Sequence, residues 1–474
     1  MQQNITLPTE QLTNQQLRQT EITPHKVFIK TYGCQMNVYD SERMEDVLRP
    51  QGYSTTNELE DADLVILNTC HIREKAAEKV YSDLGRINKV KNARQQDGKQ
   101  TIIAVGGCVG QAEGDEIIRR APYVDIVMGS QSYHLLPRLL MQAKQKKLSQ
   151  TTNKTTGGII DISFPEIQKF DLLPKPESSS GAATFVSVQE GCDKFCSFCV
   201  VPYTRGAEYS RPVQVVLDEV RALVEERGVL EVSLLGQNVN AYHGSCNDKS
   251  SSLAELIAKL AEINGLKRIR YVTSHPKDMS EDLLQAHGSI AKLMPYLHLP
   301  VQSGSDKVLK AMNRQHSAGD YMAILERLRG LRPDIAFSGD FIIGFPNESD
   351  ADFEDTMRLV QSVGYASAYS FKYSPRAGTP AAEMAGQIAE EVKVERLARL
   401  QELLNEQQMQ FNMATIGREC DVLLERKGKY AGQMLGRSPW MQSVHIDNCD
   451  AASDKIVRVR IITALGNSVS GVLV

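Results

Sequence analysis

The sequence predicts an α/β protein of three domains: an open parallel-sheet domain, a central partial (β/α)6 barrel of the TIM type, and a small C-terminal β-barrel. The first observation is length, because 474 residues exceed what a single hydrophobic core usually holds. Second, apolar runs alternate with amphipathic segments as far as residue 380, which is the pattern of βα units around parallel strands. Third, short alternating runs separated by glycines replace this pattern after residue 412, which is typical of an all-β domain.

The composition is that of an ordinary globular protein, with 42% hydrophobic and 24% charged residues. A formal charge of −4 neither requires nor excludes a nucleic-acid partner, because a sum over the chain conceals local charge. The first twenty residues lack the basic start and apolar centre of a signal peptide, and no run of about 18 apolar residues predicts a membrane span. We therefore expect a cytoplasmic protein with no membrane partner, whose nine cysteines are ligands, nucleophiles or buried side chains rather than disulfides.

The first domain is predicted at residues 25–142, after a tail at residues 1–24 that is rich in Gln, Thr and Asn and is expected to be disordered. Its strands are predicted at the apolar runs 26–30, 64–68, 101–106 and 124–129. Its helices are predicted at 38–50, 73–90 and 111–120. A polar linker that accumulates Pro, Gly and Ser is expected at residues 143–177, with one strand near 158–162.

The central domain is predicted at residues 178–410. Its strands are expected at 183–189, 230–236, 268–274, 296–302, 335–345 and 367–374, and its helices at 213–228, 251–264, 279–288, 305–313, 319–331 and 350–363. Six repeats favour a partial barrel over a closed barrel of eight, and the pattern alone also allows a doubly wound sheet. A long polar helix at 386–412 leads to the last domain at residues 413–474, predicted as a five-stranded barrel.

Three cysteines stand close together directly after the first strand of the central domain: Cys192, Cys196 and Cys199. Three thiolates within eight residues can converge on one soft metal site. A structural zinc ion usually recruits a fourth ligand at a similarly short spacing, and the next candidates here are some 45 residues downstream. A [4Fe–4S] cluster bound by three cysteines keeps one iron free for an added ligand, so the spacing favours such a cluster over zinc.

A second cysteine trio is dispersed along the first domain. Cys34, Cys70 and Cys108 follow its first three predicted strands. Because the carboxyl ends of parallel strands face one crevice, we expect these side chains to gather in space. Gly33 and the Gly106-Gly107 pair are expected to permit close backbone approach around inorganic sulfide. The alternative is three separate buried structural cysteines.

Polar residues at the ends of other central strands are candidates for binding a cosubstrate, since barrel active sites lie at those ends. They are Gly236, Gln237, Asn238, Ser274, Gln302 and Asp340. An ordinary βα turn is the alternative for residues 236–238. Arg205 is either a clamp for a carboxylate or phosphate or a solvated loop arginine. We interpret His298 as a structural histidine and find no ligand pattern for Cys246, Cys420 and Cys449.

From residue 25 onward the sequence resembles the radical-SAM methylthiotransferase family, in which S-adenosylmethionine starts radical chemistry. The motifs that carry the resemblance are TYGCQMNVYDSERM, NTCHIREKAAEKV, GGCVGQ, QEGCDKFCSFCVVPYTRG, LHLPVQSGS, IIGFPNE and YSPRAGTPAA. HIREKAAEKV and VVPYTRGAEYSRP are most similar to the branch that modifies isopentenyladenosine in tRNA. The last domain resembles a TRAM module, a small RNA-binding barrel.

The resemblance implies two [4Fe–4S] clusters. An auxiliary cluster on the residues matching Cys34, Cys70 and Cys108 holds the sulfur that is methylated, and a second cluster on Cys192, Cys196 and Cys199 generates the radical. The reaction adds methylthio to C2 of N6-isopentenyladenosine at position 37 of tRNA. The resemblance also implies that residues 236–238 contact the methionine part of S-adenosylmethionine and that an unidentified electron donor, flavodoxin-like or ferredoxin-like, is needed.

Three charged residues near the start of the last domain, Arg426, Lys427 and Lys429, are candidates for phosphate contacts, or form an ordinary solvated turn. Trp440 is a candidate for base stacking, although a lone Trp is more often part of a core. Three alternative functions stay open. They are the same chemistry on threonylcarbamoyl-adenosine in tRNA, the same chemistry on ribosomal protein S12, and a zinc-stabilised RNA-binding protein without catalysis.

Overall fold

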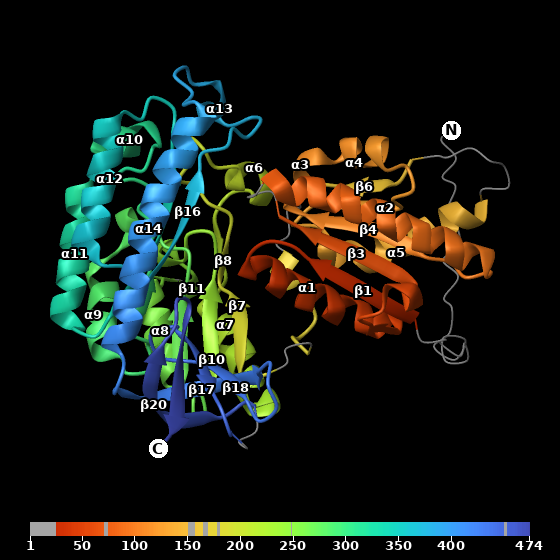
Figure 1. Cartoon of the computed structure of the whole chain (residues 1–474). Coiled ribbons are helices and arrows are strands. Elements are labelled where there is room, and N and C mark those ends of the chain that lie inside the picture. The colour runs from red at the N-terminus through yellow and green to blue at the C-terminus, as the bar shows by residue number, and fades with distance from the viewer. Residues whose placement is uncertain are drawn as a thin grey trace.

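A computed structural model describes residues 25–70, 74–149, 157–164, 169–177, 181–247, 249–449 and 453–474. The tail predicted at residues 1–24 lies outside these ranges. The N-terminal domain lies beside the central domain, and the C-terminal barrel lies at the lower end of the central domain (Figure 1). The predicted fold class is confirmed for all three parts.

The N-terminal domain is a parallel sheet of six strands in the order β2-β1-β3-β4-β5-β6. Its strands are β1 (His25–Thr31), β2 (Tyr53–Thr55), β3 (Leu64–Thr69), β4 (Ile102–Gly107), β5 (Ile126–Met128) and β6 (Ile159–Asp161). The two central strands, β3 and β4, are buried along their whole length, which explains their continuous apolar sequences. The strand expected near residues 158–162 is β6, which pairs with β5, so this sheet includes residues beyond 142.

Helices cover both faces of this sheet. They are α1 (Gln35–Leu48), α2 (Glu74–Gln96), α3 (Cys108–Glu113), α4 (Asp115–Arg120) and α5 (Leu136–Ser149). One hydrophobic core contains residues of α1 and α5, such as Leu48 and Leu139, and the core on the other face contains Val80 and Leu84 of α2. The helices therefore shield the strands and leave the carboxyl edge of the sheet for a binding site.

The central domain is a partial barrel. Its parallel strands are β7 (Ala183–Ser187), β10 (Glu231–Leu235), β13 (Arg268–Tyr271), β14 (Tyr296–His298), β15 (Ala336–Ile343) and β16 (Ser367–Lys372), in two groups ordered β13-β10-β7 and β14-β15-β16. A parallel bridge joins Ile269 of β13 to Leu293, three residues before β14, and so connects the two groups. The spatial order therefore follows the chain, whereas a doubly wound sheet would reverse it.

Helices alternate with these strands and form the outer layer. They are α7 (Val213–Arg227), α8 (Leu253–Ala261), α9 (Glu281–Ser289), α10 (Asp306–Ala311), α11 (Ala318–Leu331) and α12 (Asp350–Val363). Ser252, Ser317 and Ser349 start α8, α11 and α12 with capping boxes, in which the Ser hydroxyl and an acidic side chain three residues later satisfy backbone N–H groups. These caps explain why the three helices begin close to the predicted positions.

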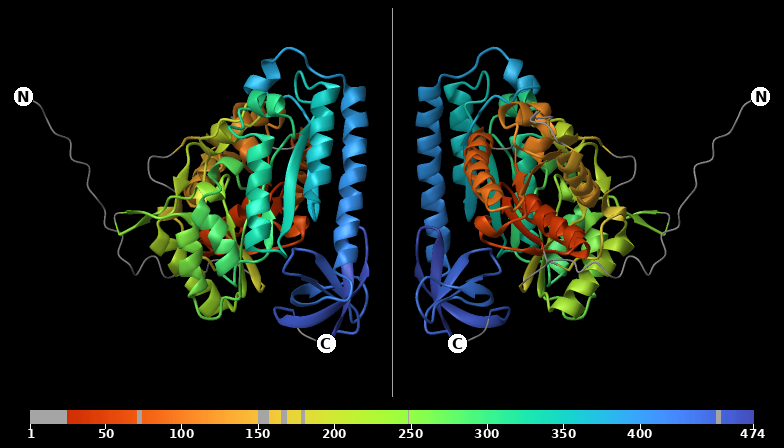
Figure 2. Two further views of the ribbon diagram at one scale, coloured as in Figure 1. Left: turned by 90° about the vertical axis from the view of Figure 1, so that its left-hand side faces the viewer. Right: turned by 90° about the vertical axis from the view of Figure 1, so that its right-hand side faces the viewer.

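The long helix α14 (Glu390–Ala414) runs down the outside of the central domain and enters the C-terminal barrel (Figure 2). The short helix α13 (Pro380–Glu383) precedes it. The barrel is closed, in the order β17-β18-β19-β21-β20. Its strands are β17 (Glu419–Lys427), β18 (Met434–Arg437), β19 (Ser443–Ile446), β20 (Ile456–Ala464) and β21 (Ser468–Leu473).

Two buried arginines of β13 fasten the C-terminal barrel to the central domain. Arg268 donates to the carbonyl oxygens of Asp421 and Arg437, and Arg270 donates to those of Ser438 and Pro439. Arg268 is the first and Arg270 the third of the four residues of β13, and the N–H of Ala182, directly before β7, donates to Asp454 Oδ1 of the barrel. The barrel therefore packs at the end of the central strands that lies opposite their carboxyl ends.

Candidate active site

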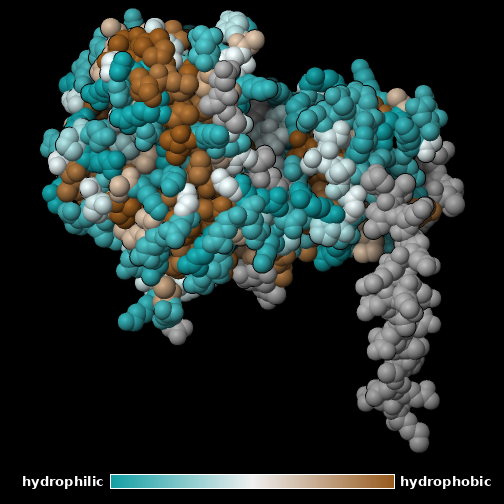
Figure 3. All heavy atoms as spheres, turned by 90° about the horizontal axis from the view of Figure 1, so that it is seen from below, coloured by the Kyte–Doolittle hydropathy of each residue, from teal (hydrophilic) through white to brown (hydrophobic). Residues whose placement is uncertain are grey.

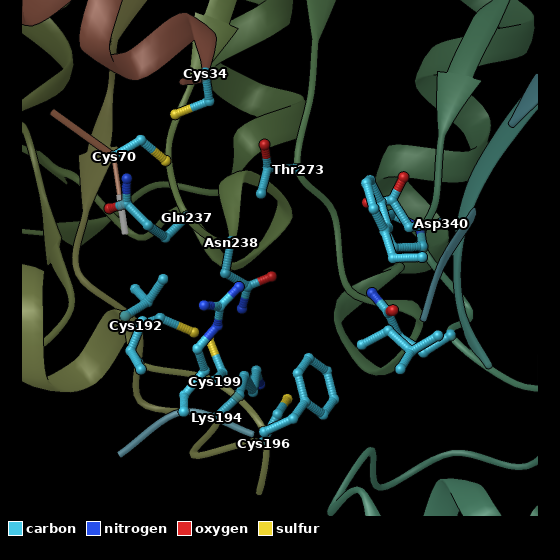
Figure 4. A pocket seen from close by; sticks show the side chains of 18 of the residues that line it. Cys34, Cys70, Cys192, Lys194, Cys196, Cys199, Gln237, Asn238, Thr273 and Asp340 are labelled. Atoms are coloured by element: carbon cyan, nitrogen blue, oxygen red, sulfur yellow. The ribbon is translucent and has the colours of Figure 1, made fainter. Parts of the chain in front are cut away.

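A cavity of about 920 Å³ lies between the N-terminal and central domains, and both cysteine trios line it. Cys34 and Cys70 lie at one end with their sulfur atoms turned inward, and Cys192, Cys196 and Cys199 lie at the other end (Figure 4). Gln237, Asn238 and Thr273 lie between the two ends, and Asp340 lies on the opposite wall (Figure 4). Residues far apart in the sequence thus share one chamber.

The N-terminal trio gathers because β1, β3 and β4 are neighbours in the sheet. Cys34 is the N-cap of α1, Cys70 directly follows β3, and Cys108 begins α3 after β4. A hydrogen bond from Cys70 outweighs the opposing desolvation and, together with the charge of Arg205, lowers the pKa of Cys34 to about 6. Cys34 is therefore readily ionised at neutral pH, as a metal ligand must be.

Two glycines allow this gathering. Gly33 has φ +107°, and a Cβ there would lie 2.2 Å from Cβ of Cys70. Gly107 has φ +86°, and its Cβ would lie 2.4 Å from the carbonyl oxygen of Thr69. The close approach that the sequence predicts at these glycines is thus made to the neighbouring cysteine loops.

The second trio stands on an excursion of the chain that is closed at its base by an antiparallel pair. β8 (Gln189–Glu190) pairs with β9 (Tyr209–Ser210), and the cysteines and α6 (Val201–Arg205) lie between these strands. Burial raises the pKa of Cys192 to about 11 and that of Cys199 to about 12. A bound metal would supply the positive charge that these buried thiolates need. Arg314 Nη1 also lies 3.7 Å from Cys196 Sγ.

The arrangement of donors fits clusters better than single ions. Within the ranges that the structure describes, no three His, Cys, Asp or Glu side chains converge closely enough to hold one metal ion. A zinc site needs ligand atoms about 2.0–2.3 Å from the metal. Thiols that surround a larger space are suited to an iron–sulfur cluster, whose irons each bind a separate cysteine.

All six cosubstrate candidates line the cavity: Gly236, Gln237, Asn238, Ser274, Gln302 and Asp340. The turn after β10 is held by the side chain of Gln189, whose Oε1 accepts from the backbone N–H groups of Gln237 (2.8 Å) and Asn238 (3.1 Å). Gln237 in turn accepts from the N–H of Gly191, next to Cys192, at 2.6 Å. The turn is thus fixed against the cysteine loop.

Three buried polar atoms of the cavity wall have no hydrogen-bond partner among the described residues: Asn238 Oδ1, Ser274 Oγ and His275 Nε2. Such groups are costly unless a ligand or water satisfies them.

Two further wall residues, Thr273 (φ +66°) and Gln302 (φ +79°), have left-handed backbone conformations. Backbone strain of this kind is typical of functional sites. His275, Thr273 and Arg314 carry no sequence signal, because each is recognisable only once the strand ends are assembled.

The other residues singled out in the sequence lie in different surroundings. Arg205 is buried and pairs with Asp40 and Glu190 of the protein itself, so the solvated-arginine alternative is wrong. His298 bonds Ser338 Oγ at 3.0 Å, as a structural histidine does, but it also lines the cavity.

Trp440 is 9% exposed and belongs to the core of the C-terminal barrel. Cys420 and Cys449 lie in that same core, and Cys246 is partly buried.

The three basic residues of the last domain lie partly in a strand and partly in the turn that follows it. Arg426 and Lys427 end β17, and Lys429 follows in the turn, all three exposed. The view from below looks onto the side that carries this barrel and shows mostly hydrophilic side chains, with a hydrophobic band across its left part (Figure 3). No helix within the described residues is long and apolar enough to cross a bilayer.

Comparison with known sequences decides the family. Residues 26–129 match the uncharacterized protein family UPF0004, and residues 186–360 match the radical SAM superfamily. The tRNA-2-methylthio-N(6)-dimethylallyladenosine synthase of Wolbachia pipientis subsp. Culex pipiens (strain wPip) is 56% identical over 449 residues, which cover 94% of this chain and 99% of that protein. The chain belongs to the radical-SAM methylthiotransferase family.

Solved structures resemble this methylthiotransferase family member in fold alone. The radical S-adenosylmethionine methyltransferase TsrM from Kitasatospora setae has a TM-score of 0.55 at 14% identity, over 76% of this chain and 75% of that one. The cobalamin-dependent S-adenosylmethionine radical enzyme OxsB has a TM-score of 0.52 at 13% identity, over 81% of this chain and 56% of that one.

Proposed function

We propose that this protein adds a methylthio group to C2 of N6-isopentenyladenosine at position 37 of tRNA, with two [4Fe–4S] clusters and S-adenosylmethionine. The observation that carries the proposal is the single cavity onto which both cysteine trios open. Sulfur delivery and activation of the nucleoside must occur close to each other, and a chamber shared by both trios is consistent with this requirement. The relative that is 56% identical is named for this activity, and the match covers 99% of its length.

The two ends of the cavity have different roles in this proposal. We assign the auxiliary cluster to Cys34, Cys70 and Cys108, and the cluster that binds S-adenosylmethionine to Cys192, Cys196 and Cys199. When bound, these groups supply the sulfur chemistry and the single electron that starts the radical reaction. The donor set supports the assignment, because it consists of thiols and each trio keeps one cluster iron free for an incoming molecule.

The wall between the trios is proposed to bind the cosubstrate. Asn238 Oδ1 can accept from its amino group, and Ser274 Oγ and Gln302 can bond its other polar groups. Across the cavity, Asp340 presents an acceptor, with Oδ2 3.6 Å from Nε2 of His298.

Partners and location follow from the same proposal. The substrate is tRNA, and Arg426, Lys427 and Lys429 are proposed to contact its phosphates. A flavodoxin-like or ferredoxin-like protein is expected to supply the electrons. We place the reaction in the cytoplasm, where tRNA is found and thiols stay reduced.

The competing substrates are threonylcarbamoyl-adenosine in tRNA and ribosomal protein S12. The name of the relative favours isopentenyladenosine. Reconstituted protein, S-adenosylmethionine, dithionite and tRNA that carries isopentenyladenosine without methylthio should yield the 2-methylthio nucleoside in mass spectrometry. A methylthio product on threonylcarbamoyl-adenosine or S12 instead would refute the substrate assignment. Stoichiometric zinc without labile sulfide would support the non-catalytic alternative.

A cysteine variant separates the two ends of the cavity. Cys70→Ala should still cleave S-adenosylmethionine, because Cys192, Cys196 and Cys199 are intact, but it should form no methylthio product. The measurement is 5′-deoxyadenosine and modified nucleoside by liquid chromatography with mass spectrometry. Cys246→Ala, outside the cavity, is the matched control and should keep both activities. Methylthio product from Cys70→Ala would contradict the division of roles.

A further inference from the structure

The loops that carry Cys34, Cys70 and Cys108 are held together by a buried hydrogen-bond network. Its centre is Asn37, in the first turn of α1 and fully buried. Asn37 Nδ2 donates to the carbonyl oxygen of Thr69 at 2.9 Å, and Asn68 Nδ2 donates back to the carbonyl oxygen of Asn37 at 2.8 Å. The loop of Cys34 is therefore tied to the loop of Cys70.

Thr69 extends this network to the third cysteine. Its hydroxyl donates to the carbonyl oxygen of Gly106 at 2.5 Å and accepts from the N–H of Val109 at 3.2 Å. These two groups lie on either side of Cys108. Because Asn37, Asn68 and Thr69 are fully buried, the network resists exchange with water and fixes the three loops relative to one another.

Arg205 enters this network from the other domain. It ends α6, six residues after Cys199, and is 3% exposed. Its Nη2 lies 3.5 Å from Asn37 Oδ1, and the same oxygen lies 3.5 Å from Cys34 Sγ. The chain thus places a permanent positive charge one side chain away from the N-terminal trio.

The charge of Arg205 is balanced by carboxylates that are themselves buried. Asp40 Oδ2 accepts from Nη2 at 2.8 Å, and Glu190 Oε1 accepts from Nη1 at 2.6 Å. Lys169 Nζ pairs with Glu190 at 2.7 Å and lies 3.7 Å from Asp40. A buried ion cluster of this kind rarely improves stability over an apolar one, so its presence beside the cysteines indicates a role in the site.

Within the cluster, Arg205 is the cation on the cysteine side. Lys169 turns the other way, with Nζ bonded to the carbonyl oxygen of Ser130 and 4.4 Å from the ring centre of Tyr133. Any group held by the trio therefore lies in the field of Arg205 more than in that of Lys169.

We propose that Arg205 is a positioning residue that sets the redox potential of the auxiliary cluster and holds that cluster site against the radical domain. The inference rests on the proposed function, because it assumes a cluster on Cys34, Cys70 and Cys108. A reduced cluster carries one more negative charge than an oxidised one. A fixed positive charge close to it stabilises the reduced state and raises the potential. Asp40 partly offsets that charge.

The test uses the full-length chain with Cys192, Cys196 and Cys199 changed to Ala, which keeps only the N-terminal trio. After anaerobic reconstitution, iron and sulfide are counted and the cluster is titrated by electron paramagnetic resonance at controlled potentials. Arg205→Met should lower the ratio of reduced to oxidised cluster at a fixed potential about tenfold, a shift of about 59 mV to more negative values. Arg205→Lys keeps the charge and should shift the potential in the same direction by less.

Asp40→Asn provides a test of opposite sign. It preserves shape and removes a negative charge beside Arg205, so the potential should become more positive. Arg211→Met is the matched control, because Arg211 is equally buried and paired with Glu219, and none of its described contacts is with the trio. A role in stability alone predicts loss of thermal stability in both Met variants with no change of potential.

The outcomes are distinguishable. An unchanged potential in Arg205→Met with full cluster content would overturn the inference and leave the proposed function standing. If Arg205→Met fails to fold or to hold a cluster, the sign of the Asp40→Asn shift decides, and a shift to more negative values or none would overturn it. A parent chain that binds no cluster would overturn the assignment of the trio, and this inference with it.

Discussion

At the scale of single residues, Gly33 determines whether the loops of Cys34 and Cys70 can touch. Gly33→Ala places a methyl group 2.2 Å from Cβ of Cys70 on a backbone with φ +107°. We expect the free energy of unfolding to fall by about 1–3 kcal/mol and bound iron at the N-terminal trio to decrease. Iron and sulfide analysis with urea unfolding measures both.

Gly85→Ala is the control for this change. Gly85 lies within α2, and nothing stands within 4 Å of the place that an alanine methyl group would take there. Alanine there should raise stability by about 0.5–1 kcal/mol, because it reduces the entropy of the unfolded chain. If Gly33→Ala bound as much iron as Gly85→Ala, close packing of the two cysteine loops would not matter.

His287 makes the stability of the central domain depend on pH. It is fully buried, and burial, followed by the charge of Arg332, lowers its pKa from 6.5 to about 3. Its stabilising contribution is complete above the unfolded pKa of 6.5 and is lost as pH falls towards 3, because the unfolded chain binds the proton first. Between pH 8 and pH 5 this one residue should cost about 2 kcal/mol.

Urea unfolding at the two pH values tests this prediction. His287→Gln cannot take up the proton, so the decrease in stability from pH 8 to pH 5 should be smaller than in the unchanged protein. Tyr271, whose hydroxyl lies 2.7 Å from His287 Nε2, keeps a polar neighbour in this variant. An equal decrease in both proteins would show that His287 does not contribute.

At the scale of elements, long apolar runs predicted the parallel strands well, since β3, β4 and β10 are buried along their whole length. Short elements could not be found in this way. β2 has three residues, and β8 and β9 have two each, too few for any period to be visible. Their pairing depends on the surrounding fold rather than on their own sequence.

In the site, too, some features are predictable from the sequence and others depend on the assembled fold. Two cysteine trios were found because strand ends are predictable from the chain. The role of Arg205 is ambiguous in the sequence, because its partners Asp40 and Glu190 are 165 and 15 residues away and come together only when the domains pack. Asn37 gave no signal for a similar reason, because its partners Asn68 and Thr69 belong to another strand.

The strand β13 is expected to control the attachment of the C-terminal barrel. Arg270→Met removes two bonds to Ser438 and Pro439 and leaves Glu231, which is 3% exposed, without its 2.9 Å partner. Arg268 Nη1 stays 3.4 Å from Glu231 Oε2 and compensates part of its charge, so the loss should lie below the about 3–5 kcal/mol that is typical of an unpaired buried charge. We therefore expect a marked fall in the thermal midpoint measured by calorimetry.

Arg458→Ala is the control, since its ion pairs on the surface of the barrel are exposed. It should change stability by no more than about 0.5 kcal/mol. Equal effects of Arg270→Met and Arg458→Ala would mean that β13 does not anchor the barrel.

At the scale of the whole molecule, the C-terminal barrel and the cysteine cavity lie at opposite ends of the central strands. Arg268, the first residue of β13, and Ala182, directly before β7, hold the barrel, whereas the residues that follow β13 line the cavity. A ligand that contacts both places must span the length of these strands, of which β15 has eight residues at about 3.3 Å each. The substrate must therefore be a large molecule if both places take part, which is consistent with tRNA.

This separation leads to a prediction about the basic residues of the barrel. Changing Arg426, Lys427 and Lys429 together to Ala should raise KM for tRNA about tenfold and leave kcat unchanged, because phosphate contacts contribute to binding and not to the chemical step. The dependence of log affinity on log salt should become less steep by about 2–3 units, at roughly 0.7–0.9 per phosphate contact.

The control removes three exposed cations from outer helices of the other two domains, which are Lys89, Arg227 and Lys259. It matches the change in net charge, so it should reproduce any effect that depends only on the overall field of the protein. A larger decrease in the salt dependence of tRNA binding in the barrel variant than in this control would place phosphate contacts on the barrel. Equal salt slopes in the two variants would instead mean that the exposed cations after β17 form a solvated turn and that tRNA is held elsewhere.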